Sequence, residues 1–295
     1  MATVVQPASL PPRRSAAAMF ALMQPLGTAG LLVILVMAVA AAFAPWVAPY
    51  DPLTVDYGAM LAAPSLEHWF GTDAFGRDVL SRIIYGARTA LAIGFISSLF
   101  GCTTGAGIGT ASAYFGGKID LVIQRFVDIL LSFPIIVLAL VVVTVLGKWQ
   151  MLGIDMNLIG AIAIPIVPKV ARVVRSSALA IRTMPYVDAA RAAGYSHTRI
   201  IFRHMVPNIM APFLIMFTAF IAQAILLEAS LSFLGLGVTE PTPAWGLMLS
   251  GNAADFYREA PWMILFPGIA ISLAVFAFNL FGDSLRDWFD PKFKV

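Results

Sequence analysis

Histidine and cysteine are the side chains most often used for metal binding and nucleophilic catalysis, and this sequence holds few of them. Its three histidines, His68, His197 and His204, do not form the HExxH pair through which zinc proteases bind their metal. The one cysteine, Cys102, excludes an intrachain disulfide and any cysteine-based zinc site. We therefore expect no metal site in this chain.

The sequence also lacks the residues that a nucleotide-binding site requires. The nearest approach to a phosphate-binding loop is the segment FGGK, residues 115–118. Ser112 stands where that loop requires its first glycine, and Ile119 stands where a serine or threonine would bind magnesium. No GxSxG nucleophile turn occurs either. The sequence predicts a protein that is not an enzyme, with no catalytic residue and no cofactor bound by the chain itself.

Charged residues inside long apolar segments are the next candidates, because a charge in a bilayer is costly and is often kept for a function. Asp128 and Glu228 lie near the ends of such segments, and Lys169 and Arg172 can extend to the membrane surface. For each of them, an interface anchor or a contact between helices is the alternative to a role in function. Since no series of carboxylates crosses the apolar segments, a proton-driven pump is not supported.

The most informative polar segment is a loop, residues 175–208, that reads RSSALAIRTMPYVDAARAAGYSHTRIIFRHMVPN. Residues 186–193 are rich in alanine and favour a short helix. Pro185 suits the start of that helix and Gly194 its end. A second helical run is predicted over residues 196–205, ending before the following proline. The loop therefore reads as helix, glycine, helix.

This loop carries several arginines, namely Arg182, Arg191, Arg199 and Arg203. Small alanines on a short helix allow it to enter a groove on a partner, where guanidinium groups can meet acidic side chains or backbone carbonyls. The alternative is an amphipathic surface loop with no partner.

These residues belong to an unusually apolar chain. Of its 295 residues, 60% are hydrophobic and 12% are charged, whereas a soluble domain has roughly 45–50% and about 25%. The mean hydropathy is +0.86. Such a composition excludes an ordinary soluble domain and a disordered chain. The sequence pI is about 9.1, but the net charge is only +3, so nucleic acid is not an expected partner.

Six apolar segments are long enough to cross a membrane, since a hydrocarbon core of about 30 Å needs roughly 20 helical residues. They are residues 27–47, 90–113, 127–146, 156–174, 209–231 and 262–281. The first is longer than the apolar part of a cleaved signal peptide, which has about 7–15 residues. The sequence predicts an all-α integral membrane protein with six transmembrane helices.

The placement of lysine and arginine gives the orientation, because basic loops remain in the cytoplasm. With both termini inside, five of the 19 basic residues lie outside: Arg77, Arg82, Arg88, Lys148 and Arg258. The others lie inside, and many of them are in or just before the 175–208 loop. An N-in, C-in topology is predicted, with this loop on the cytoplasmic face.

Small residues recur along the second apolar segment. Ser97, Gly101, Gly105 and Gly109 are four positions apart and share one face of a helix. Such a stripe lets a neighbouring helix approach closely, within this chain or in a partner. Before this segment, residues 77–88 can form a short helix at the membrane surface.

The loop then suggests a family. The triplet DAA at residues 188–190 is followed after three residues by Gly194 and after nine more by HMVP, residues 204–207. This arrangement resembles the EAA loop of bacterial ABC importer permeases, whose pattern is EAA-x3-G-x9-I-x-L-P. Asp188 replaces the glutamate of the pattern but keeps the carboxylate, and His204 stands at the isoleucine position.

Other segments resemble the same branch of the family. They are FGTDAFGRDVLSRIIYGART (70–89), AYFGGKID (113–120), EASLSFLGLG (228–237), PTPAWGLML (241–249) and NLFGDSLRDWFDP (279–291). Together these segments cover nearly the whole chain. The sequence is similar to the DppC/OppC-type permeases of dipeptide, oligopeptide and nickel ABC importers.

The resemblance implies a type I ABC importer permease fold in the bacterial inner membrane. It implies that the chain forms half of a pathway for peptides with a second, homologous permease subunit. Two cytoplasmic ATPase subunits would hold ATP and magnesium, and an extracytoplasmic binding protein would deliver the solute. The loop would be the coupling helix that contacts an ATPase. Its expected contact residues are Tyr186, Asp188, Ala189, Ala190, Arg191, Gly194, Arg199, Arg203 and Pro207.

The resemblance also divides the chain. A cytoplasmic tail (1–26) precedes a first transmembrane helix and periplasmic segment (27–89), a five-helix core (90–284) and a cytoplasmic tail (285–295). Nickel, glutathione, opines or oligosaccharides are alternative solutes. An intramembrane enzyme, or a scaffold subunit without a substrate path, would be a different class of protein. The sequence identifies neither the solute nor the residues that line its path.

Overall fold

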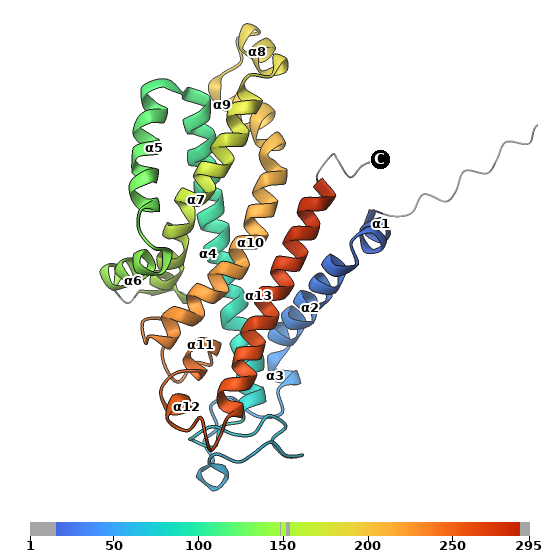
Figure 1. Ribbon diagram of the computed structural model, residues 1–295, viewed down its shortest axis with the longest axis vertical. Helices are drawn as coiled ribbons and strands as arrows, with labels where there is room; N and C mark the ends of the chain where they lie inside the picture. The colour runs from blue at the N-terminus through green and yellow to red at the C-terminus, as the bar shows by residue number, and fades with distance from the viewer. Residues whose placement is uncertain (1–15, 148, 152–153, 290–295) are drawn as a thin grey trace, which may run out of the picture.

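The computed structural model describes residues 16–147, 149–151 and 154–289 as an elongated bundle of helices (Figure 1). The helices are α1 (Ala16–Met23), α2 (Pro25–Ala42), α3 (Ala44–Val47), α4 (Val79–Phe115), α5 (Gly117–Leu131), α6 (Ile135–Leu146), α7 (Met156–Arg182), α8 (Pro185–Ala192), α9 (His197–Ile200), α10 (Val206–Phe233), α11 (Trp245–Met248), α12 (Asn252–Asp255) and α13 (Trp262–Phe289). A 3-10 turn, η1 (Tyr57–Ala59), and a π-helical turn, η2 (Ile201–Met205), complete the helical elements. Strands β1 (Gln150–Met151) and β2 (Ile154–Asp155) pair antiparallel before α7. Lys148 and parts of both predicted tails lie outside the described residues.

The long apolar helices follow the predicted spans. Within the described residues, five helices are long and apolar enough to cross a membrane, and the bent pair α5 and α6 would make a sixth span. The prediction of an all-α membrane protein with six spans is thereby confirmed in its main features. The start of α1 and the end of α13 lie in the half of the molecule that carries α8 (Figure 1).

The predicted third span, residues 127–146, is not a single helix. That segment belongs to two helices, α5 and α6, which meet at an angle of 95°. Pro134 causes the break, because it has no N–H to donate and disfavours helical backbone at the residue before it. The Ser132 hydroxyl donates to the Ile129 carbonyl, 2.6 Å away, and so helps to end α5. In Figure 1, α6 lies across the long axis of the bundle.

The sequence suggested a separate surface helix over residues 77–88, but the structure does not contain one. Helix α4 begins at Val79 and continues for 37 residues, so the predicted domain boundary after residue 89 falls inside it. Asp78 caps its start, because Oδ2 accepts hydrogen bonds from the backbone N–H and hydroxyl of Ser81 at 2.8 and 2.7 Å. At 1.5 Å per residue α4 is about 55 Å long, so it extends beyond a hydrocarbon core of about 30 Å.

The small-residue stripe of α4 packs against α7. A Cβ atom added to Gly101 would lie 2.9 Å from the Ala163 carbonyl oxygen, and one added to Gly105 would lie 2.7 Å from that of Val167. At Gly109 it would overlap the Ala171 carbonyl oxygen. Ser97, at the other end of the stripe, is fully buried. The two backbones therefore approach so closely over two turns that no larger side chain fits between them.

The described residues contain three buried hydrophobic clusters, and two of them hold the long helices together. The larger includes Ile166 and Val170 of α7 and Leu231 of α10, all fully buried. The other includes Ile225 of α10 and Trp245 of α11, and α2 and α13 also contribute to it. Figure 1 shows α2 beside α13, at the edge of the bundle away from α5.

The close contact between α4 and α7 predicts a large effect from a single methyl group. We expect Gly109→Ala to destabilise the purified protein by about 1–3 kcal/mol, because the added carbon overpacks against Ala171. Gly107→Ala is the matched control on the same helix, since no atom beyond the neighbouring backbone of α4 lies within 4 Å of its added carbon. Unfolding in SDS–detergent mixtures measures both. Equal stability of the two variants would contradict the packing described.

Candidate functional site

The end of the bundle that carries α8 is the candidate site (Figure 1). Pro185 occupies the first turn of α8, where its missing N–H leaves no partner unsatisfied. Gly194 ends the helix with a φ of +74°, a conformation that strains any residue with a side chain. Its N–H donates to the Arg191 carbonyl at 2.9 Å, and the Tyr195 N–H donates to the Ala190 carbonyl at 3.1 Å. The predicted short helix followed by a glycine is present.

One face of α8 is fixed to the bundle. Val187 is 0% exposed and Ala190 is 6% exposed, and both belong to the larger hydrophobic cluster. Ile200 of α9 and Met205 of η2 join the same cluster at 1% and 0% exposure. The loop is therefore seated on the end of the bundle through buried apolar contacts.

The opposite face of α8 is open. The predicted contact residues on the surface are Tyr186, Asp188, Ala189, Arg191, Gly194, Arg199, Arg203 and Pro207. Ala190 differs from them, because its side chain points into the bundle and holds α8 in place. Eight of the nine predicted residues thus share one accessible end of the molecule.

Polar contacts link this loop to the end of α4. Arg191 donates to Asp188 Oδ1 at 3.0 Å, and its guanidinium lies 5.4 Å from the ring centre of Tyr114. The Tyr114 hydroxyl lies 2.8 Å from Nδ1 of His197 in α9. An exposed ion pair such as that between Arg191 and Asp188 contributes about 1 kcal/mol or less to stability. These contacts therefore orient the loop more than they stabilise it.

His204, which stands at the isoleucine position of the family pattern, lies among aromatic rings. Its ring centre is 6.1 Å from that of Tyr195 and 6.4 Å from that of Tyr186. The Arg199 guanidinium lies 4.0 Å from the ring centre of Tyr195. The imidazole of η2 therefore packs near one aromatic ring of α8 and one of the turn that follows it.

The sequence predicted that the second helical run of the loop ends before Pro207, but in the structure the helix continues past it. Helix α9, η2 and α10 form one continuous helical segment from His197 to Phe233. Pro207 lies in the first turn of α10 directly after the π-helical turn, whose wider backbone accommodates the missing N–H. No flexible connection therefore separates the loop from α10.

Ionic contacts also connect the base of the loop to α5. Arg175 of α7 donates from Nε and Nη2 to the two oxygens of Asp120, at 2.6 and 2.5 Å. Arg182 donates to the Ala113 carbonyl of α4 at 3.0 Å, so it faces this chain rather than a partner. Arg172 pairs with Asp128. Asp128, one of the intramembrane candidates, is thus part of a contact between α5 and α7.

Glu228, the other acidic candidate, is completely buried in α10. Its Oε1 accepts a hydrogen bond from the Ser232 hydroxyl at 2.7 Å, and the Val238 N–H donates to that hydroxyl at 3.1 Å. Glu228 therefore takes part in holding the turn that follows α10. Within the described residues, no group of three His, Cys, Asp or Glu side chains could hold a metal ion.

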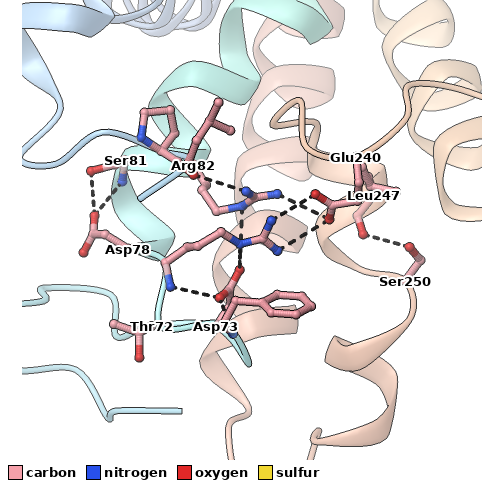
Figure 2. Close-up of polar contacts among 12 residues, drawn as sticks. Thr72, Asp73, Asp78, Ser81, Arg82, Glu240, Leu247 and Ser250 are labelled. Carbon is pink, nitrogen blue, oxygen red and sulfur yellow. Dashed lines mark hydrogen bonds and ion pairs between the residues drawn. The ribbon is translucent and has the colours of Figure 1, made fainter. Parts of the chain in front are cut away.

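At the opposite end of the bundle lies a charge cluster that sequence reasoning did not identify (Figure 2). Arg77 donates to Asp73 Oδ2 at 2.6 Å and to Glu240 Oε2 at 2.9 Å, although Glu240 lies 163 residues away along the chain. The Arg82 guanidinium lies 3.7 Å from Glu240 and 3.9 Å from Asp73. We call these four residues the outer clamp. It joins the segment before α4 to the segment after α10.

Burial alone would lower the pKa of Arg77, but the hydrogen bonds and charges of Glu240 and Asp73 raise it above its ordinary value. The guanidinium therefore stays charged. The signal available in the sequence was the set of charges in the FGTDAFGRD and TEPTPAW segments. Their spacing could not reveal that they meet.

Comparison with known proteins gives consistent results. Residues 103–295 match the family described as binding-protein-dependent transport system inner membrane component, and residues 14–64 match the N-terminal transmembrane domain of oligopeptide transport permease C. The dipeptide transport system permease protein DppC of Alkalihalophilus pseudofirmus is 43% identical over 91% of this chain and 86% of its own length. The glutathione transport system permease protein GsiD of Escherichia coli is 44% identical over 90% of this chain and 86% of its own length.

A solved structure is similar in fold. The MetNI methionine ABC transporter in an inward-facing conformation matches with a TM-score of 0.56 at 18% identity, over 71% of this chain and 96% of the matched chain. At this level of identity the match concerns the fold alone.

The outer clamp predicts a specific loss of stability. Asp73→Asn leaves two buried arginines with a single, half-exposed carboxylate, and we expect it to destabilise the protein by about 3 kcal/mol. The control is Glu259→Gln, an exposed residue near the same end, with a change within about 0.5 kcal/mol. Denaturation of the purified protein compares the two. A loss below about 1 kcal/mol for Asp73→Asn would show that the clamp does not hold these segments together.

Proposed function

The chain belongs to the family of inner-membrane components of binding-protein-dependent transport systems, and we propose that it forms half of the translocation pathway of an ATP-driven peptide importer. It is a multi-pass permease of the inner membrane and not a catalytic subunit. In this proposal ATP and magnesium are bound by two separate ATPase subunits. A second, homologous permease completes the pathway, and an extracytoplasmic binding protein delivers the solute. Nucleic acid is not a partner.

The observation that carries the proposal is the geometry of α8. Its apolar face is buried on the bundle through Val187 and Ala190, while Asp188, Ala189 and Arg191 face outward. A short helix that is fixed on one side and open on the other can dock into a partner. We assign it the role of coupling helix, with its outer face against an ATPase.

The connection of the loop to α10 supplies the mechanical part of the proposal. A transporter needs an element whose two conformations are populated differently when nucleotide binds. Because α9, η2 and α10 are one continuous helical segment, a displacement of α8 and α9 passes into α10 without a flexible joint. At its other end, α10 leads to Glu240 of the outer clamp. Movement at the ATPase would in this way reach the opposite side of the membrane.

The solute class rests on the relatives. Their names specify dipeptides, peptides and glutathione, and glutathione is itself a small peptide. We therefore propose a peptide as the solute and glutathione as the second candidate. Selectivity among peptides belongs mainly to the binding protein, because the apolar spans of this chain offer few polar groups for recognition.

The coupling role predicts that two changes in the loop abolish transport. Gly194→Pro removes the positive φ that turns the chain after α8, and Asp188→Arg reverses the charge on its outer face. We expect peptide uptake and substrate-stimulated ATPase activity to fall at least about tenfold in the complete transporter, which corresponds to roughly 1.4 kcal/mol of lost coupling. Membrane insertion, measured by the amount of protein in washed membranes, should remain.

Glu259→Arg is the control for the charge reversal, since it makes the same change on an exposed residue at the opposite end. We expect normal uptake in this variant. If uptake and ATPase stimulation both survive Gly194→Pro and Asp188→Arg, α8 is not the coupling helix.

The proposed assembly predicts which subunits copurify with this chain. When it is coexpressed with the neighbouring genes and extracted in mild detergent, a tag on this chain should retain two ATPase subunits and one further permease. Densitometry of the purified complex measures their ratio. A chain recovered without ATPase subunits would favour the scaffold alternative.

A further inference from the structure

An apolar groove lies on the bundle between α2 and α4. Its volume is about 770 Å³. Leu31 to Ala42 of α2 form one wall and Arg88 to Ile96 of α4 form the other, while Phe217 of α10 and Phe281 of α13 contribute to the lining. Ala38 of α2 and Phe95 of α4 are exposed in this lining, so the groove is accessible from outside the bundle.

The length and position of the groove match one leaflet of a membrane. From Leu31 to Ala42, eleven residues of α2 at 1.5 Å per residue span roughly 16 Å. This is about half of a hydrocarbon core of about 30 Å. Helix α2 ends at Ala42, directly before α3, and α3 lies in the half of the bundle away from α8 (Figure 1). The groove therefore belongs to the leaflet on that side, where an acyl chain of a lipid would lie alongside it.

The lining of the groove contains no carboxylate and one cation, Arg88. The one hydroxyl in the lining, that of Thr218, donates to carbonyl groups of its own helix. The walls consequently suit a hydrocarbon chain, and Arg88 marks the end of the groove at the membrane surface.

Arg88 differs from the arginines near it. Arg77 and Arg82 are paired with Asp73 and Glu240 in the outer clamp. Across the part of the chain that the structure describes, Arg88 has no ion-pair partner, and its guanidinium lies 6.0 Å from the ring centre of Tyr85. An unpaired guanidinium at the surface end of an apolar groove is complementary to a phosphate joined to a hydrocarbon chain.

We propose that the groove between α2 and α4 binds one anionic phospholipid, with an acyl chain against Leu91, Phe95 and Ile34 and the headgroup phosphate paired with Arg88. The proposal concerns the groove alone and does not depend on the transport function. A helix of a second subunit is the other occupant that an apolar groove could take. It is treated as an outcome of the test.

The test uses the complete transporter in nanodiscs of phosphatidylcholine that contain a small fraction of photoactivatable phosphatidylglycerol, with the reactive group on an acyl chain. We expect labelling of peptides from α2 and α4. Arg88→Gln should lower this labelling about fivefold, which corresponds to roughly 1 kcal/mol, because the charge-assisted contact with the phosphate is lost. Arg258→Gln is the matched control, since Arg258 also has no ion-pair partner among the described residues and contacts a neighbouring tyrosine, but does not line the groove.

A second pair of variants tests the groove itself. Ala38→Trp fills the groove from the α2 side, whereas Val39→Trp adds the same ring to the neighbouring, exposed position outside the lining. Labelling of α4 should be lost in the first variant and kept in the second. Unlabelled phosphatidylglycerol should compete with the probe, and added phosphatidylcholine should not.

Three results would overturn the proposal. Labelling that is unchanged in both Arg88→Gln and Ala38→Trp would mean that the lipid contacts the bundle elsewhere. Equal competition by phosphatidylcholine would remove the role of the anionic headgroup. A disulfide between a cysteine placed at Ala38 and a helix of the second permease would mean that protein fills the groove.

Discussion

The contact between the α4 and α7 backbones is the constraint on which the rest of the arrangement depends. Gly101, Gly105 and Gly109 allow the two helices to meet with no side chain between them. In a membrane, where apolar side chains gain little by leaving lipid, such close packing is a main source of helix association. Helix α7 continues from this contact to Arg182, three residues before α8 begins. The position of the loop that carries α8 thus follows from a stripe of glycines in another helix.

From the loop, a continuous path of rigid elements leads to the other side of the membrane. Helix α8 is held by buried contacts, and α9, η2 and α10 follow without a flexible joint. Beyond α10, Glu240 pairs with Arg77 in the segment that starts α4. Helices α4 and α10 are therefore linked at both ends, by apolar packing near the loop and by charge at the outer clamp. Such a frame can move between two arrangements as a unit, as a two-state transporter requires.

Much of this architecture could be predicted from the sequence, because hydropathy reports directly on the solvent that surrounds a helix. The spans, the stripe on α4, and the proline and glycine that bound α8 all have local causes. The predictions that were wrong concerned features that depend on the backbone around a single residue or on contacts between distant parts of the chain. Pro134 bends a segment that hydropathy reads as one span, and the π-helical turn carries the chain past Pro207. The outer clamp joins residues 163 positions apart, so no local pattern could indicate it.

The decisive question is whether the outer face of α8 contacts an ATPase subunit in the working transporter. A cysteine at the exposed Ala189, in a background where the buried Cys102 is replaced by serine, can be crosslinked in the assembled complex without and with ATP. The account predicts a crosslink to an ATPase subunit whose yield changes when ATP binds. A crosslink yield no higher than that of a cysteine at Glu259, on the opposite side of the membrane, would contradict it.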